Sequence, residues 1–269
     1  MVTGACRSVT GRRWTEIISL VRTTAARAAL TMVTVAALGA GCSAVLDQVA
    51  MAAPGGGPAA GSTAGSTAAP SGDAAAALKA LPVKGRAPKT GYTREQFGPA
   101  WADIDRNGCD QRNDVLKRDM ERETFKPGTH DCVVLTGSLA DPYTGKKIAF
   151  TRGQGTSEAV QIDHVIALSN AWQTGAQQLD AATRKSLGND PLNLMAVDGP
   201  TNQSKGDSDA ATWLPPVKSY RCTYVARQVA VKAKYRLWVT PAERDAISGI
   251  LAGCPGQPLP KDGTVPAPK

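Results

Sequence analysis

Histidines and closely spaced cysteines are scarce in this chain, which limits the metal sites that it can build. Its 269 residues include two histidines, His130 and His164, and six cysteines. No two cysteines form a Cys-x-x-Cys pair, which argues against a zinc knuckle. His130, Asp131 and Cys132 stand in a row and offer one competing metal site, but Cys132 is better used in a disulfide.

A hydrophobic run long enough to span a membrane is also missing near the N-terminus. The apolar stretch 28–40 is shorter than the roughly 20 residues of a spanning helix. Small residues follow it up to GAGCSA, and this order is typical of an export signal, which we predict over 1–44. Basic residues precede it: Arg7, Arg12, Arg13, Arg22 and Arg27.

The end of this signal allows two outcomes. LGAGC resembles a lipobox with Cys42 as the lipidated residue, although Leu38 lies one position too far from the cysteine. Simple cleavage near residue 44 is the alternative. Either outcome predicts a protein that is secreted or anchored to the outer face of a bacterial cell membrane.

Charge is almost absent from residues 50–77, which consist mainly of Ala, Gly, Ser, Thr and Pro. Such a segment buries too little apolar surface to offset the entropy lost on ordering. We therefore predict a disordered linker over 45–78, a folded domain over 79–254 and a disordered tail over 255–269. The formal net charge of +8 fits a partner that carries phosphates, and it equally fits a basic secreted protein.

Four cysteines remain inside the predicted domain: Cys109, Cys132, Cys222 and Cys254. Their even number and wide spacing, in an exported chain, indicate two disulfides. Order along the chain favours Cys109–Cys132 and Cys222–Cys254, although four cysteines allow three connectivities.

Residue spacing in the domain predicts an α+β fold. Helices are expected over 93–104, 112–123, 169–187, 201–207, 220–238 and 240–254. Strands are expected as a pair within 133–153 around the turn ADPYTGK, one in QIDHVIAL from residue 161, and one over 189–197. Thr240-Pro241-Ala242-Glu243 forms a capping box that opens the last helix.

Basic and aromatic side chains in this domain are interpreted first as structural. The helix 220–238 carries five basic residues, which we interpret as a solvated face rather than a DNA contact: Arg221, Arg227, Lys232, Lys234 and Arg236. Four tryptophans are interpreted as packing residues rather than base-stacking platforms: Trp101, Trp172, Trp213 and Trp238.

Asp163 and His164 form the most informative pair of the chain. The ordinary pKa of histidine, about 6.5, suits proton transfer, and aspartate is a hard oxygen ligand for a divalent ion. Because neighbours on a strand point to opposite faces, we expect the pair at a distorted strand end or the lip of a loop. Asn193 on the next strand, then Asn202 and Lys205 on a helix, complete a strand–strand–helix order.

This order resembles the HNH, or ββα-metal, nucleases. It is most similar to small secreted bacterial HNH proteins related to the C-terminal domain of GmrSD-type restriction enzymes. The segments that carry the likeness are IDHVIAL, NDPLNLMAVDGPTNQSKGD and DAATWLPP, and the resemblance extends from about Trp101 to Cys254. It implies a ββα-metal core within a mostly helical single domain. It also implies a metal-dependent endonuclease of weak sequence specificity that hydrolyses DNA, with RNA as an alternative substrate.

The resemblance also assigns roles to single residues. It makes His164 the general base, Asn193 the residue that orients it, and Asp163 and Asn202 the metal ligands. Asn202 stands where the family name has a histidine, and an amide carbonyl suits a hard ion, so Mg²⁺ or Mn²⁺ is expected rather than Zn²⁺. Apart from the resemblance, Lys205 is expected to contact a phosphate as a point charge, with a solvated lysine on the helix surface as the alternative, and Arg112 is expected to face the substrate groove and bind phosphate.

The segment DIDRNGCDQRND, residues 103–114, allows a second interpretation. It places Asp103, Asp105, Asn107, Gly108 and Asp114 at positions 1, 3, 5, 6 and 12 of an EF-hand loop. A structural Ca²⁺ site and an Asx-rich turn pinned by Cys109 both stay open. The calcium reading leads to a rival function, a non-catalytic calcium-stabilised binding protein of the cell envelope. Otherwise we expect a monomer that acts on nucleic acid and contacts a membrane only through a lipid anchor. The sequence does not identify an immunity protein that would bind it.

Overall fold

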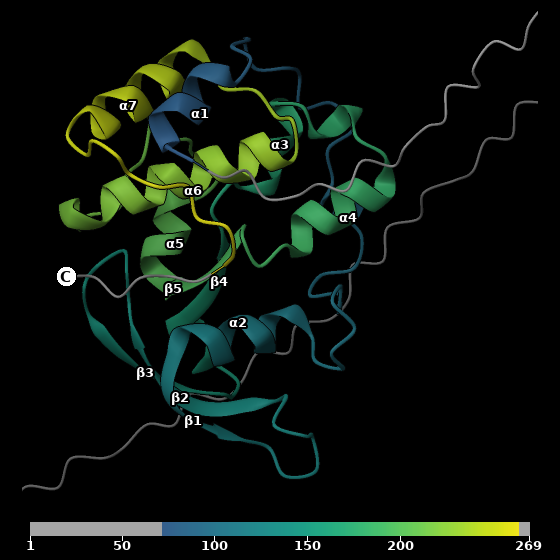
Figure 1. The fold of residues 1–269 in the computed structure, drawn as a ribbon. Coiled ribbons are helices and arrows are strands. Elements are labelled where there is room, and N and C mark those ends of the chain that lie inside the picture. The colour runs from purple at the N-terminus through teal and green to yellow at the C-terminus, as the bar shows by residue number, and fades with distance from the viewer. Residues whose placement is uncertain (1–71, 264–269) are drawn as a thin grey trace, which may run out of the picture. The chain divides into compact units, whose positions relative to one another are not determined.

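The computed structural model describes residues 72–263, which fold as a mixed α+β domain (Figure 1). Its helices are α1 Ala74–Ala80, α2 Gln111–Asp119, α3 Leu168–Gln173, α4 Ala181–Asn189, α5 Gly199–Lys205, α6 Arg221–Lys234 and α7 Pro241–Ala252. Its strands are β1 Met120–Phe125, β2 Val134–Ala140, β3 Lys147–Thr151, β4 Val160–His164 and β5 Leu194–Asp198. Short 3₁₀ turns are η1 Arg94–Phe97, η2 Ser157–Ala159, η3 Ala176–Gln178 and η4 Lys218–Tyr220. The α+β class expected from the sequence is confirmed.

Two small antiparallel sheets organise the strands. One has the order β1-β2-β3, and the other pairs β4 with β5. In the second sheet the register runs regularly from Val160 opposite Asp198 to His164 opposite Leu194. Helix α5 begins directly after β5 and contacts both strands, so β4, β5 and α5 follow the strand–strand–helix order expected from the sequence.

The β4–β5 pair lies between two hydrophobic cores. Ile162 and Ala196 belong to the core that β1–β3 and α2 complete. Met195 and Val197 belong to the larger core beneath α1, α6 and α7. Because successive side chains of a strand point to opposite faces, this two-stranded sheet contributes to both cores. Packing on both faces holds the end of β4 in place.

Helix α6 is buried more deeply than its basic sequence indicated. The Arg227 guanidinium donates to the carbonyl oxygens of Leu192, at 2.7 Å, and of Leu194, at 3.0 Å. The Lys232 ammonium lies 2.9 Å from a carboxylate oxygen of Glu243, the capping-box residue of α7. The solvated-face interpretation is therefore wrong for Arg227 and Lys232, which are 1% and 0% exposed.

Several predicted helices are shorter in the structure, for local reasons. The helix predicted over 93–104 is only η1, because Gly98 follows with a φ of 73°. The helix predicted over 112–123 ends at Asp119, and the next residues pair with β2 as strand β1. The helix predicted over 169–187 is broken at Gly175, where φ is 129°.

The domain also extends past both predicted boundaries. Helix α1 begins at Ala74, inside the predicted linker, and it packs on α6 and α7 with Leu78 buried. Past residue 254, Leu259 is buried and the Gly263 carbonyl accepts from Arg227. The predicted export signal 1–44 and Cys42 lie outside the described residues. Between residues 72 and 263, no helix has the length and apolar character needed to cross a membrane.

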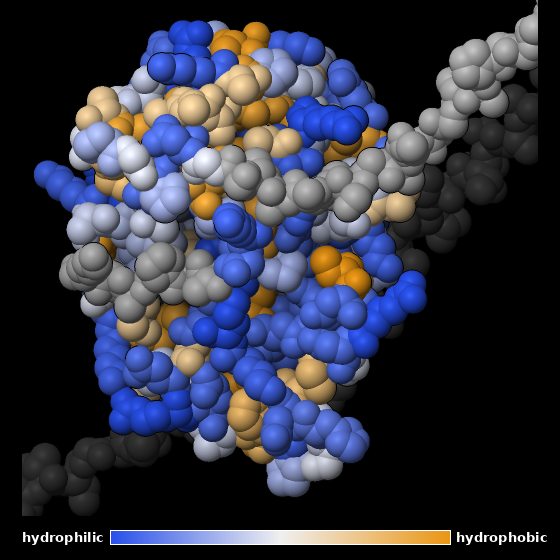
Figure 2. Space-filling model, viewed as in Figure 1, coloured by the Kyte–Doolittle hydropathy of each residue, from blue (hydrophilic) through white to orange (hydrophobic). Residues whose placement is uncertain are grey.

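Two disulfides fix the ends of the helical elements. Cys109–Cys132 joins the loop before α2 to the start of β2, and Cys222–Cys254 joins α6 to the end of α7. This is the pairing that chain order favours. On the face drawn in Figure 2, hydrophobic residues form small groups separated by hydrophilic ones.

Candidate active site

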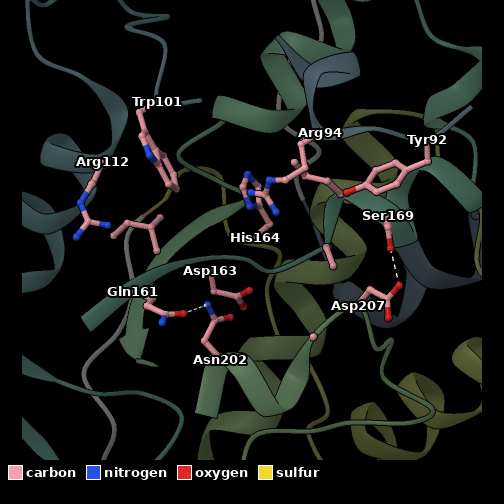
Figure 3. A pocket seen from close by; sticks show the side chains of 14 residues that line it. Tyr92, Arg94, Trp101, Arg112, Gln161, Asp163, His164, Ser169, Asn202 and Asp207 are labelled. Atoms are coloured by element: carbon pink, nitrogen blue, oxygen red, sulfur yellow. Dashed lines mark hydrogen bonds between the residues drawn. The ribbon is translucent and has the colours of Figure 1, made fainter. Parts of the chain in front are cut away.

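A cavity of about 430 Å³ opens at the end of β4. It brings together the predicted residues Asp163, His164, Asn202 and Arg112 (Figure 3). Segments far apart in the sequence complete its wall with Tyr92, Arg94, Trp101, Gln161, Ile162, Ala167, Leu168, Ser169, Gly206 and Asp207. Asn193 and Lys205 lie behind this wall.

The strand end explains how Asp163 and His164 reach one cavity. His164 is the last residue of β4, so the strand ends where the pair stands. Asp163 pairs with Met195 and His164 with Leu194 in regular register. An open strand end, without a distortion in this pairing, lets two side chains from opposite faces border the same space.

Two donors hold the Asp163 carboxylate. Lys205 Nζ lies 2.9 Å from Oδ1, and the Tyr143 hydroxyl donates to Oδ2 at 2.5 Å. Burial, reinforced by the Asp163 charge, raises the pKa of Tyr143 well above its ordinary value, so the phenol stays protonated and keeps donating. Tyr143 comes from the turn between β2 and β3, which therefore reaches the site.

Lys205 differs from the phosphate ligand that the sequence predicted. It is 1% exposed, and its ammonium also donates to the His164 carbonyl oxygen at 2.9 Å. Its three donor positions thus point into the protein. In the structure Lys205 is the buried counterion of Asp163, and it ties α5 to the end of β4.

His164 is held as a neutral base. Its Nε2 lies 2.8 Å from the Gly188 carbonyl oxygen, which can only accept, so the neutral ring carries its hydrogen on Nε2. Nδ1 is then the proton acceptor. Burial lowers the pKa of His164 to about 4, so the imidazole is neutral near pH 7. The Trp101 ring stacks on it with centroids 6.1 Å apart and planes 17° apart.

Asn193 bonds backbone groups near His164 and does not bond its imidazole. Its side-chain oxygen accepts from the Ile166 N–H at 2.8 Å, and its Nδ2 donates to the Leu187 carbonyl at 3.3 Å. The imidazole itself is bonded to Gly188, the next residue after Leu187. The contact to the imidazole is thus made by the backbone carbonyl of Gly188, and the orienting role of Asn193 stays a prediction.

Asn202 presents an oxygen toward Asp163. Its Nδ2 donates to Gln161 Oε1 at 2.9 Å, which turns the carbonyl oxygen the other way, beside Asp163 (Figure 3). Helix α5 carries it and is capped by Asp198, which accepts from the Thr201 N–H. The first residue, Gly199, lies so close to η2 that an added Cβ would stand 2.0 Å from the Glu158 carbonyl oxygen.

The oxygens of Asp163 and Asn202 fit a hard divalent ion. Each carboxylate oxygen has a second lone pair besides the one used by Lys205 or Tyr143. Within residues 72–263, no three or more His, Cys, Asp or Glu side chains converge to cage an ion. Mg²⁺ typically takes one or two protein oxygens and completes its shell with water and phosphate. The competing cluster at His130 has lost its thiolate, because Cys132 is oxidised.

Two arginines give the cavity its positive charge. Arg112 is partly buried and Arg94 is exposed, and both line the cavity. The arginines that form salt bridges in the described chain are Arg86, Arg118 and Arg244. Arg94 and Arg112 are therefore available to an anionic ligand.

The loop 103–114 uses its carboxylates within a turn. Asp103 accepts from the backbone N–H groups of Asn107, at 3.2 Å, and Gly108, at 3.0 Å. Asp110 caps α2 by accepting from the Asn113 N–H. These contacts account for the loop as an Asx-rich turn, which is the second of the two interpretations above. The Ca²⁺ site at Asp103, Asp105, Asn107 and Asp114 stays a prediction without an ion-binding cluster in the described chain.

Comparisons with known proteins agree with the likeness seen in the sequence. Residues 110–250, roughly half of the chain, match the family described as "GmrSD restriction endonucleases, C-terminal domain". The chain belongs to this family. A protein of Arthroderma benhamiae (strain ATCC MYA-4681 / CBS 112371), named "Uncharacterized secreted protein", is 38% identical over 183 residues. The alignment covers 67% of this chain and 84% of that protein. No solved structure matches.

Four residues of the site carry little signal in the sequence. Arg94 and Trp101 lie before residue 110, outside the matched range. Tyr143 is inside it, and its signal is an aromatic residue in the middle of a polar turn. Gly188 contributes only a carbonyl oxygen, for which no side chain provides a signal.

Breaking the Asp163–Lys205 pair should destabilise the domain. We expect Asp163→Asn and Lys205→Met each to lower the free energy of unfolding by about 3–5 kcal/mol, because each leaves a buried group unpaired. The double variant should cost much less than the sum, as measured by urea denaturation. The exposed Arg244–Asp245 pair serves as a control, with a coupling of about 1 kcal/mol or less. Additive losses at Asp163 and Lys205 would contradict the pairing.

The close approach at Gly199 should tolerate no side chain. Gly199→Ala must push α5 away from η2, and we expect it to lower the free energy of unfolding by roughly 1–3 kcal/mol. Gly249, inside α7, has no atom within 4 Å of an added Cβ. The control Gly249→Ala should therefore raise stability by roughly 0.5–1 kcal/mol. Equal effects of the two substitutions in thermal melts would show that α5 is not confined at its start.

Proposed function

We propose that this chain is an exported endonuclease that uses a divalent metal ion to hydrolyse the phosphodiester bonds of DNA, with RNA as an alternative substrate. The observation that carries the proposal is the state of His164, a neutral base beside two oxygen ligands. Nε2 is occupied by the Gly188 carbonyl, which leaves Nδ1 as the acceptor in a cavity shared with Asp163 and Asn202. The GmrSD C-terminal family gives independent support for a nuclease-related function.

Each part of the cavity has a role in this proposal. His164 accepts a proton from the attacking water, and Arg94 and Arg112 hold the phosphate by charge. Asp163 and Asn202 would hold Mg²⁺ or Mn²⁺, which would stabilise the negative charge that develops on the phosphate. Lys205, Tyr143 and Asn193 keep the acting groups in position.

Substrate preference and location follow from the same surfaces. The charged groups of the cavity recognise phosphate, which every nucleotide carries, so weak sequence specificity is expected. Export is supported by the N-terminal sequence and by the two disulfides, which persist in oxidising compartments. The name of the Arthroderma benhamiae relative describes that protein as secreted.

His164→Ala tests the proposal most simply, in digestion of supercoiled plasmid. The wild type should cut with Mg²⁺ or Mn²⁺ and stop with EDTA. The variant should lose roughly 10²–10⁴-fold in rate, the usual effect of removing a general base, while its melting temperature and its DNA affinity stay close to those of the wild type. A folded variant that cuts at the wild-type rate would refute the assignment of His164.

The pH dependence of cleavage distinguishes this partly buried histidine, with its lowered pKa, from an ordinary one. An ordinary pKa predicts activity that rises near pH 6.5. Because the pKa of His164 is lowered to about 4, the neutral and active form already prevails above about pH 5. Cleavage should therefore be level between about pH 6 and 8 and fall only on stronger acidification. A pH–rate profile with its midpoint near pH 6.5 would contradict the lowered pKa of His164.

A further inference from the structure

A second cavity, of about 300 Å³, adjoins the first. The two cavities share Arg94, Trp101, His164 and Leu168 in their walls. Its remaining lining is mainly the segment around η1 and the end of α4: Glu95, Phe97, Gly98, Pro99, Ala100, Gly188 and Asn189. The roles described above do not use this space.

The second cavity has charges of both signs in its wall, Arg94 on the side shared with the first cavity and Glu95 beside it. Glu95 brings a carboxylate, and hydrogen bonds from its own backbone N–H and from Thr93 lower its pKa, so it is ionised. Gly188 and Phe97 contribute a carbonyl oxygen and an apolar ring. With one cation and one anion in its wall, this cavity has no excess of positive charge to favour a phosphate in its interior, whereas a flat, neutral ring that carries N–H donors suits it.

Trp101 is held in an unusual backbone conformation at the boundary of the two cavities. Its φ is 60°, which a bulky residue rarely adopts and which often marks a functional site. The buried Asn189 side chain bridges both flanks, since it accepts from the Ala102 N–H at 2.8 Å and donates to the Pro99 carbonyl at 3.3 Å. The indole stays partly exposed and stacked on His164.

We infer that the second cavity is a nucleobase subsite, in which Trp101 stacks on the base of the nucleotide next to the phosphate that is cut. The inference rests on the proposed function and adds to it a contact with the base. His164 and Arg94 line both cavities, so a base bound in the second cavity would leave its linking phosphate within the wall that Arg94 shares. Stacking tolerates every base, which agrees with weak sequence specificity. For Trp101, this replaces the interpretation as a packing residue alone.

The test uses an end-labelled, single-stranded thymidine oligonucleotide that carries one abasic tetrahydrofuran nucleotide. In the wild-type ladder, the phosphate next to this nucleotide should be cut roughly 5- to 150-fold less than the others, the range expected from losing one stacked base. Trp101→Ala should cut that phosphate and the others at similar rates, and Trp101→Phe should keep the wild-type pattern. Because every comparison lies within one lane, a general loss of activity does not change the ratio.

A wild-type ladder without interruption at the abasic nucleotide would overturn the subsite while leaving the nuclease proposal intact. A second measurement separates the two. Fluorescence anisotropy of the His164→Ala protein compares a thymidine oligonucleotide with a fully abasic one of equal length. Tighter binding of the thymidine strand, lost when Trp101→Ala is added, supports the subsite. This holds even if the wild type shows no cleavage, a result that would refute only the nuclease function. Equal binding of the two strands overturns the subsite.

Discussion

The buried ion pair between Asp163 and Lys205 is the interaction on which the rest of the site depends. It joins β4 to α5, and Tyr143 adds the turn between β2 and β3 to the same carboxylate. Burying two charges costs several kcal/mol per ion, and the cost is offset only when partners and hydrogen bonds are complete. Here Lys205 has the carboxylate and the His164 carbonyl, so three separate segments must meet for any of them to be stable.

This pair also sets the electrostatics of the candidate metal site. Asp163 offers a full negative charge, but the ammonium 2.9 Å away neutralises much of it. Asn202 adds a neutral oxygen. Such a site attracts a divalent ion weakly by itself, and a bound phosphate would supply the missing charge and ligands. The free guanidinium groups of Arg94 and Arg112 would bring that phosphate to the same cavity, so substrate and ion are expected to bind cooperatively.

The sequence predicted the parts of the site that are encoded locally. Asp163 and His164 are adjacent, Asn202 lies on the helix after the second strand, and the four cysteines pair in their order along the chain. The missing parts depend on tertiary contacts. Arg227 and Lys232 look like surface residues in a basic helix, and only the carbonyls before β5 and Glu243 of α7 explain their burial. In the same way, the fold alone brings Tyr143 to Asp163 and Trp101 to His164.

We propose that Asp163 and Asn202 hold a divalent ion in the cavity that His164 also lines. Electron paramagnetic resonance of Mn²⁺ bound to the His164→Ala protein measures this without any cleavage. We expect weak Mn²⁺ binding to the protein alone and tighter binding when a short DNA strand is present. Adding Asn202→Ala or Asp163→Ala should remove the tight site. If all three proteins bound Mn²⁺ with the same affinity, with and without DNA, the ion would be held elsewhere, and the assignment of Asp163 and Asn202 as its ligands would be contradicted.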